Sequence, residues 1–146
     1  MVFFPRKFLT KQEGDSIINC IKEAEKMTSG EIRVHFQKKI KGDVKDAAVD
    51  AFLRLKMYET ADRNGVLFFI VPKKKLFAVI GDKGIDEVVP DDFWTEVIEL
   101  LETYFKDKKW NEGLCKAIAK TGKKLKKYFP IQEDDKNELP DEISYS

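Results

Sequence analysis

Apolar and polar residues follow two different periods along this chain, and these periods predict an ordered series of helices and strands. A helix is expected to begin at Thr10, because Thr10-Lys11-Gln12-Glu13 has the form of a capping box and apolar residues at helical spacing follow it. Residues 31–36 alternate between apolar and polar, which is typical of a strand with one buried face. Residues 43–58 return to helical spacing.

The second half of the chain adds two strands and two helices. Residues 65–71 form an uninterrupted apolar run, as expected for a central strand that is covered on both faces. The polar turn 72–75 leads to a further strand at 76–80, and so short a connection makes these two strands antiparallel. Helices are expected after Pro90-Asp91-Asp92 and after Trp110-Asn111-Glu112-Gly113. The order predicts an α/β domain with a small mixed sheet, a β-α-β-β core and about four flanking helices.

This topology predicts that three glycine-bearing motifs meet at one rim of the sheet. A full helix connects strand 31–36 to strand 65–71, so the two are expected to be parallel, which places Ser29-Gly30-Glu31 beside Asn64-Gly65. The third strand runs the other way and ends at the same edge, in Gly81-Asp82-Lys83-Gly84. The rim residues expected from this arrangement are Ser29, Glu31, Asp62, Arg63, Asn64, Gly65, Gly81, Asp82, Lys83, Gly84, Asp86, Asp91 and Asp92.

The chemistry expected at this rim is cation binding. Carboxylates contributed by separate loops suit a hard cation such as Ca²⁺ or Mg²⁺, which prefers oxygen ligands. The expected metal ligands are Asp62, Asp82, Asp91 and Asp92. Each motif also has a structural explanation, because Asn64-Gly65 is a common turn and Ser29-Gly30 a common helix end. Only their convergence favours a site.

Composition and charge narrow the class of protein. The 146 residues are 42% hydrophobic, enough for one core, and Cys20 and Cys115 are expected to be buried, reduced thiols. No signal peptide or membrane-length apolar run is visible, so a cytoplasmic protein without a membrane span is expected, and as a monomer. Net charge is +1, and the lysine runs are interpreted as solvated faces rather than a nucleic-acid surface.

The last residues differ in composition from the rest. Residues 132–146 hold six acidic residues and one lysine, a net charge of −5. We therefore expect a domain at 1–130 and a flexible acidic tail at 131–146. The tail is interpreted either as solubilising or as a second contact element for an unidentified protein partner.

Two segments of this chain resemble the TPM-domain family, which includes the thylakoid acid phosphatase-like domain. They are Arg63-Asn64-Gly65-Val66-Leu67-Phe68-Phe69-Ile70 and Phe77-Ala78-Val79-Ile80-Gly81-Asp82-Lys83-Gly84-Ile85. Ser29-Gly30-Glu31-Ile32, Asp91 and Asn111-Glu112-Gly113-Leu114 also match, so the resemblance covers roughly residues 10–130. It implies a three-layer α/β/α sandwich with a rim site, in a soluble bacterial-type member. Members of the family are associated with phosphatase activity, divalent-cation binding, repair of photosystem complexes and accessory roles on membrane receptors.

Two functions remain open. The first is a divalent-cation-binding interaction or assembly module with its site near 29–31, 62–65, 81–86 and 91–92. The alternative is a metal-assisted phosphatase with Asp82, Arg63 and Lys83 as catalytic candidates. No phosphatase nucleophile is evident, since the segment after Cys115 lacks the expected arginine and His35 lies in mid-strand, where a structural role is expected.

Overall fold

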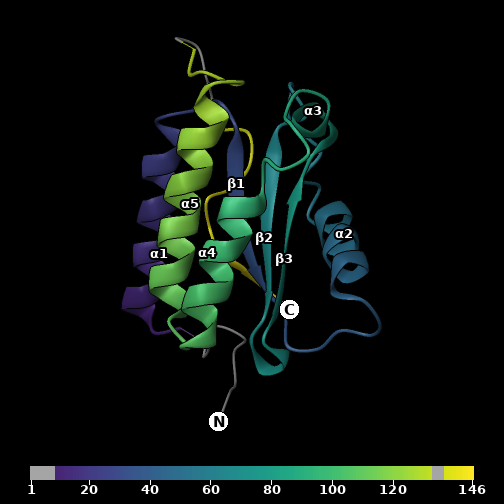
Figure 1. The fold of residues 1–146 in the computed structure, drawn as a ribbon, viewed down its shortest axis with the longest axis vertical. Coiled ribbons are helices and arrows are strands. Elements are labelled where there is room, and N and C mark those ends of the chain that lie inside the picture. Colours follow the sequence, from purple (N-terminus) through teal and green to yellow (C-terminus); the bar gives the residue numbers. More distant parts are fainter. Residues whose placement is uncertain (1–8, 133–136) are drawn as a thin grey trace.

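The computed structural model describes residues 9–132 and 137–146 as a mixed sheet flanked by helices (Figure 1). Within these residues the sheet has the order β3-β2-β1-β4, with β1 parallel to β2 and β2 antiparallel to β3. The elements are α1 (Lys11–Glu25), β1 (Glu31–Phe36), α2 (Val44–Arg54), β2 (Gly65–Val71), the 3₁₀ turn η2 (Pro72–Lys74), β3 (Leu76–Gly81), α3 (Lys83–Asp86), α4 (Thr95–Lys106), α5 (Trp110–Lys126) and β4 (Ser144–Tyr145).

The elements form three layers, which confirms the predicted sandwich. Helices α1, α4 and α5 cover one face of the sheet, and α2 covers the other (Figure 1). Side chains alternate along a strand, so Val66 and Phe68 of β2 enter the core with α1, α4 and α5, while Leu67 and Phe69 enter the core with α2. All seven residues of β2 are buried, as its uninterrupted apolar run predicted.

The helices follow from local sequence signals. The capping box of α1 is formed as predicted: Thr10 Oγ1 accepts the Glu13 N–H at 3.0 Å, and Glu13 Oε1 accepts the Thr10 N–H at 2.8 Å. Gly122 lets α5 approach α1, since a Cβ there would lie 3.0 Å from the Ala24 Cβ. In the parts of the chain that the structure describes, no helix has the length and apolar character needed to cross a membrane.

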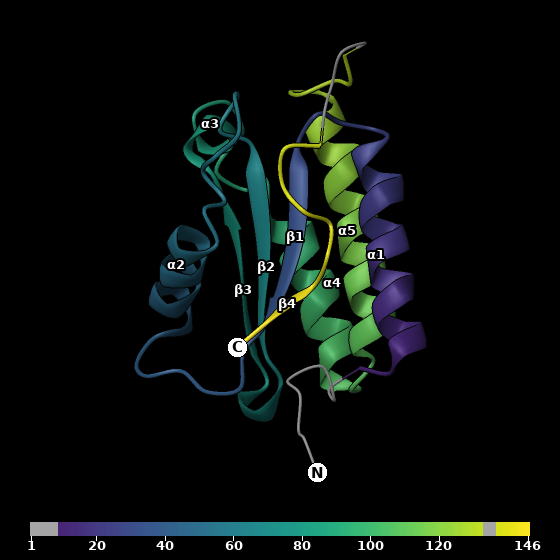
Figure 2. The ribbon, with the colours of Figure 1, turned by 180° about the vertical axis from the view of Figure 1, so that it is seen from behind.

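The C-terminal residues lie against the sheet in this structure, an arrangement that the sequence pattern did not predict. Ser144 and Tyr145 form β4, which pairs in parallel with His35 and Phe36 of β1 (Figure 2). The Ser146 N–H donates to Phe36 O at 2.9 Å, and Leu139 is only 6% exposed. Part of the segment expected as a flexible tail therefore forms the second edge of the sheet.

The expectation of two reduced cysteines is wrong in this structure. Cys20 of α1 and Cys115 of α5 form a disulfide, although 95 positions separate them in the sequence. The two helices run side by side (Figure 1), which brings the cysteines together without any local spacing signal. Disulfides are typical of oxidising compartments, so the cysteines do not support the cytoplasmic location expected from the sequence.

Candidate functional site

The three glycine motifs meet at one rim of the sheet, as predicted. Glu31 lies opposite Gly65 in the parallel pair of β1 and β2, and Gly81 lies opposite Val66 in the antiparallel pair. Backbone hydrogen bonds tie the loops together: Glu31 N–H donates to Asn64 O at 3.3 Å, and Gly84 N–H donates to Arg63 O at 2.9 Å. Any Cβ at Gly84 would collide with the Asp62 carbonyl, which explains the glycine there.

Asp82 and Arg63 form a bidentate ion pair at this rim. Arg63 Nε donates to Asp82 Oδ2 at 2.7 Å and Nη2 donates to Oδ1 at 2.9 Å, while Oδ1 also accepts the Lys83 N–H at 2.8 Å and so caps α3. The hydrogen bonds that Arg63 donates to Asp82 raise the pKa of the Arg63 guanidinium. Because Asp82 is only 5% exposed and both of its oxygens are engaged, this pair holds two rim loops together.

The other predicted metal ligands do not converge on Asp82. Asp62, Asp91 and Asp92 are exposed, as is Asp86, whose pKa is raised by partial desolvation and by nearby Asp82. Across residues 9–132 and 137–146, no group of three or more His, Cys, Asp or Glu side chains could hold a metal ion. In the described residues, the predicted ligands Asp62, Asp82, Asp91 and Asp92 are therefore not brought together as such a group.

A second carboxyl group at the rim is more unusual. Glu31 is only 3% exposed; its Oε1 accepts the Leu139 N–H at 2.6 Å, and its Oε2 has no hydrogen-bond partner among the described residues. Burial, with the nearby Glu138 carboxylate adding to it, raises the pKa of Glu31 to about 7. A buried carboxyl oxygen without a partner costs free energy unless it holds a proton or meets a cation.

Glu31 belongs to a cluster of acids. Glu25, at the end of α1, accepts the Ile32 N–H at 3.0 Å, and burial together with a hydrogen bond to Asp141 raises the pKa of Glu25 to about 9. Asp141 Oδ1 also lacks a hydrogen-bond partner in the described chain. Glu138 accepts the Ala61 N–H at 3.2 Å. The cluster Glu25, Glu31, Glu138 and Asp141 therefore joins α1, β1 and the C-terminal segment.

A small pocket of about 100 Å³ opens beside this cluster. Oxygen atoms from Ser29 and Thr28 lie near it: Asn64 Nδ2 donates to Ser29 Oγ at 3.4 Å, and Gly30 N–H donates to Thr28 Oγ1 at 3.1 Å. The lining residues are Glu25, Thr28, Ser29, Gly30, Glu31, Ile131 and Asn137. Ser29, Gly30 and Glu31 were predicted at the rim, whereas Glu25 and the C-terminal acids were not.

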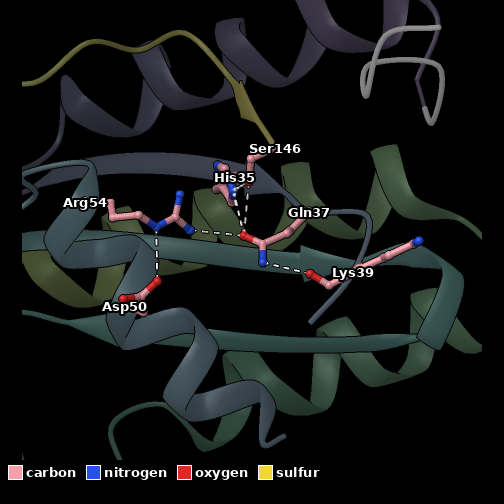
Figure 3. A network of polar contacts seen from close by, with 6 residues as sticks. All are labelled: His35, Gln37, Lys39, Asp50, Arg54 and Ser146. Carbon is pink, nitrogen blue, oxygen red and sulfur yellow. Dashed lines mark hydrogen bonds and ion pairs between the residues drawn. The ribbon is translucent and has the colours of Figure 1, made fainter. Parts of the chain in front are cut away.

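His35 has a structural role, as the sequence led us to expect. It is 1% exposed, and its Nδ1 lies 2.6 Å from Ser144 Oγ. Its Nε2 lies 2.8 Å from Ser146 Oγ (Figure 3). Gln37 Oε1 connects this group to Arg54, which donates from Nη2 at 3.2 Å. Burial, with Arg54 and Arg33 nearby, lowers the pKa of His35 to about 4. A neutral His35 therefore holds β4 on the sheet.

Solved structures share this fold. The NMR structure of the BA42 protein from the psychrophilic bacterium Bizionia argentinensis is similar with a TM-score of 0.91 and 46% identity, covering 95% of this chain and 96% of that chain. The N-terminal domain of the cg2496 protein from Corynebacterium glutamicum is similar with a TM-score of 0.64 and 12% identity, covering 79% of this chain and 72% of that chain. At so low an identity, the similarity shows the fold alone. The N-terminal domain of a protein from P. gingivalis is similar with a TM-score of 0.66 and 15% identity, covering 84% of this chain and 79% of that chain.

Similarity at the level of sequence families agrees with the fold. No curated protein matches the chain. The family model described as the TPM domain matches residues 2–124. This range includes β2 and β3, the Asn-Gly and Gly-x-x-Gly motifs at their ends, and the rim that these motifs form. This chain therefore belongs to the TPM domain family.

Proposed function

We propose that this protein is an interaction module whose rim binds a divalent cation at Glu31 and Glu25, next to the C-terminal segment. The observation that supports the proposal is the buried Glu31 Oε2, which has no described hydrogen-bond partner and lies among further carboxyl groups. Crowded carboxyls at low exposure either keep protons or attract a cation. Ca²⁺ and Mg²⁺ prefer such oxygen donors.

The donor set fits a hard cation better at this cluster than at Asp82. Glu31 Oε2 and Asp141 Oδ1 accept no hydrogen bond from the described residues, and Ser29 lines the pocket beside Glu31. By contrast, both oxygens of Asp82 are engaged by Arg63. The carboxyls are not arranged as a three-ligand group, so a cation would need to draw them inward. Such movement would tighten the C-terminal segment against the rim, which suits an assembly role.

The phosphatase alternative gains no specific support from the described residues. Arg63 and Asp82 neutralise each other, so neither is available to hold a cation or a phosphoryl group without breaking their ion pair. Lys83 is exposed and contributes its backbone N–H to the cap of α3. Hydrolysis of a generic phosphate ester that is lost in Asp82→Asn would restore this alternative.

Amide chemical shifts during Ca²⁺ and Mg²⁺ titrations test the proposal. We expect saturable shifts at Gly30, Glu31 and Leu139 in the wild type, and their loss in Glu31→Gln, which keeps an acceptor for the Leu139 N–H. Glu23→Gln, an exposed site on the same helix as Glu25, is the matched control and should behave as wild type. Shifts confined to residues 62 and 91–92 would instead favour the ligands predicted from the sequence.

A further inference from the structure

Among residues 9–132 and 137–146, no strand pairs with the outer edge of β3, and this edge borders an apolar groove. β3 pairs only with β2 in the described sheet, and its residues are exposed or half-buried, whereas those of β2 are all buried. The groove has a volume of about 660 Å³ and runs along β3, from Val44 at the start of α2 to Ile98 and Phe105 of α4. β3 lies between these two helices at the border of the sheet (Figure 1).

Backbone groups on this edge can pair with another strand. The Asp82 N–H donates to Gly65 O at 2.9 Å, which fixes which residues of β3 face β2. In an antiparallel pair, successive residues direct their N–H and C=O groups to opposite sides. The backbone N–H and C=O groups of Phe77, Val79 and Gly81 therefore point away from β2, toward the outer edge of the sheet. This row of donors and acceptors is a template for one more strand.

The charge around the groove selects the strand that it would accept. Lys45, Lys75 and Lys106 line it against a single acid, Glu102, and none of these lysines forms an ion pair with a described residue. Pairing two copies of this edge would bring lysines together, which opposes self-association. An extended segment with acidic side chains would be attracted instead.

The opposite edge of the same sheet already holds a segment of this kind. Asp141, Glu142 and Ile143 lead into β4, which pairs with β1 through Ser144 and Tyr145. We propose that the β3 edge binds an extended, acidic-apolar peptide segment of a partner protein as an added strand. Apolar side chains of the peptide would enter the groove near Phe77 and Val79, and its acids would face the three lysines. This surface is separate from the carboxyl cluster, so the proposal stands apart from cation binding.

A peptide titration of the whole protein tests this inference. The peptide is short, acetylated and alternates glutamate with valine, and the buffer contains no divalent cations. We expect saturable amide shifts and slowed hydrogen exchange centred on Phe77, Val79 and Gly81. A peptide of alternating lysine and valine should bind roughly tenfold more weakly or worse, because its charges repel the groove lysines. A glutamate-valine peptide with alternate N-methylated residues, which cannot complete the ladder, should produce no protection at these amides.

Charge reversal on the protein separates this site from general attraction. The triple variant Lys45→Glu, Lys75→Glu, Lys106→Glu should bind the acidic peptide roughly tenfold more weakly or worse. The control variant Lys22→Glu, Lys123→Glu, Lys126→Glu changes exposed lysines elsewhere and should alter the affinity for the peptide by less than about twofold. No shift at β3, equal binding of the lysine peptide, or equal effects of the two triple variants would overturn the proposal. Peptide-independent dimerisation that moves the same amides would identify a second copy as the occupant and would also overturn it.

Discussion

Replacing Glu31 with glutamine should stabilise this protein at alkaline pH. Burial raises the pKa of Glu31 from 4.5 to about 7, so the folded state holds the proton more tightly than the unfolded state. The contribution to stability is therefore full below pH 4.5 and is lost as pH rises toward 7. Glutamine is neutral at every pH, and its Oε1 can still accept the Leu139 N–H. The variant should therefore keep the stability that the wild type loses as pH rises.

The size of this effect follows from the shift. A change of 2.5 pKa units corresponds to roughly 3 kcal/mol, and discounting by about half for solvent at the rim leaves about 1–2 kcal/mol at pH 8. In urea unfolding this is a rise in midpoint of roughly 0.5–1 M. At pH 4.5 the two proteins should differ little, and the exposed control Glu23→Gln should change neither midpoint. Equal destabilisation of Glu31→Gln at both pH values would refute the account of a crowded, buried carboxyl.

Three further predictions concern the rest of the structure. Arg63→Ala should lower the melting temperature more than Arg63→Lys, because alanine leaves the buried Asp82 without any cation whereas lysine restores one of its contacts; equal losses would argue against the ion pair. Because the pKa of His35 is lowered to about 4, the stability it contributes is present above about pH 6.5 and lost as pH falls through 4; in the folded protein the amide shifts of Ser144 and Ser146 should therefore move around pH 4, and the histidine's part of this transition should be absent in His35→Phe. The double variant Cys20→Ser, Cys115→Ser should lose about 2–5 kcal/mol of unfolding free energy, and reduced wild type should match it, since the disulfide closes a chain segment of 95 positions.

The rim was predictable because it depends on connection lengths. A helix between β1 and β2 makes these strands parallel, and a short turn makes β2 and β3 antiparallel, so Glu31, Gly65 and Asp82 must reach one edge. The roles of those residues were not predictable in the same way. Nothing in the residue type of Asp82 shows that Arg63 occupies both of its oxygens.

The features that the sequence missed are long-range contacts without a periodic pattern. β4 has only two residues, too few for any alternation to show, and the segment that leads into it brings Glu138 and Asp141 to the carboxyl cluster. The disulfide depends on the packing of α1 on α5, which brings Cys20 to Cys115. Spacing along the chain does not encode either contact, because both arise from tertiary packing.

The most direct test of cation binding at Glu31 and Glu25 is calorimetric titration with Ca²⁺ at pH 7.5 in buffers of different ionisation enthalpy. Burial holds the pKa of Glu25 at about 9 and that of Glu31 at about 7, so a cation that binds these carboxyls must displace protons. The account predicts release of about one proton per bound Ca²⁺, and less in Glu31→Gln together with weaker binding. Absence of binding at millimolar Ca²⁺, or binding whose heat is independent of the buffer, would contradict it.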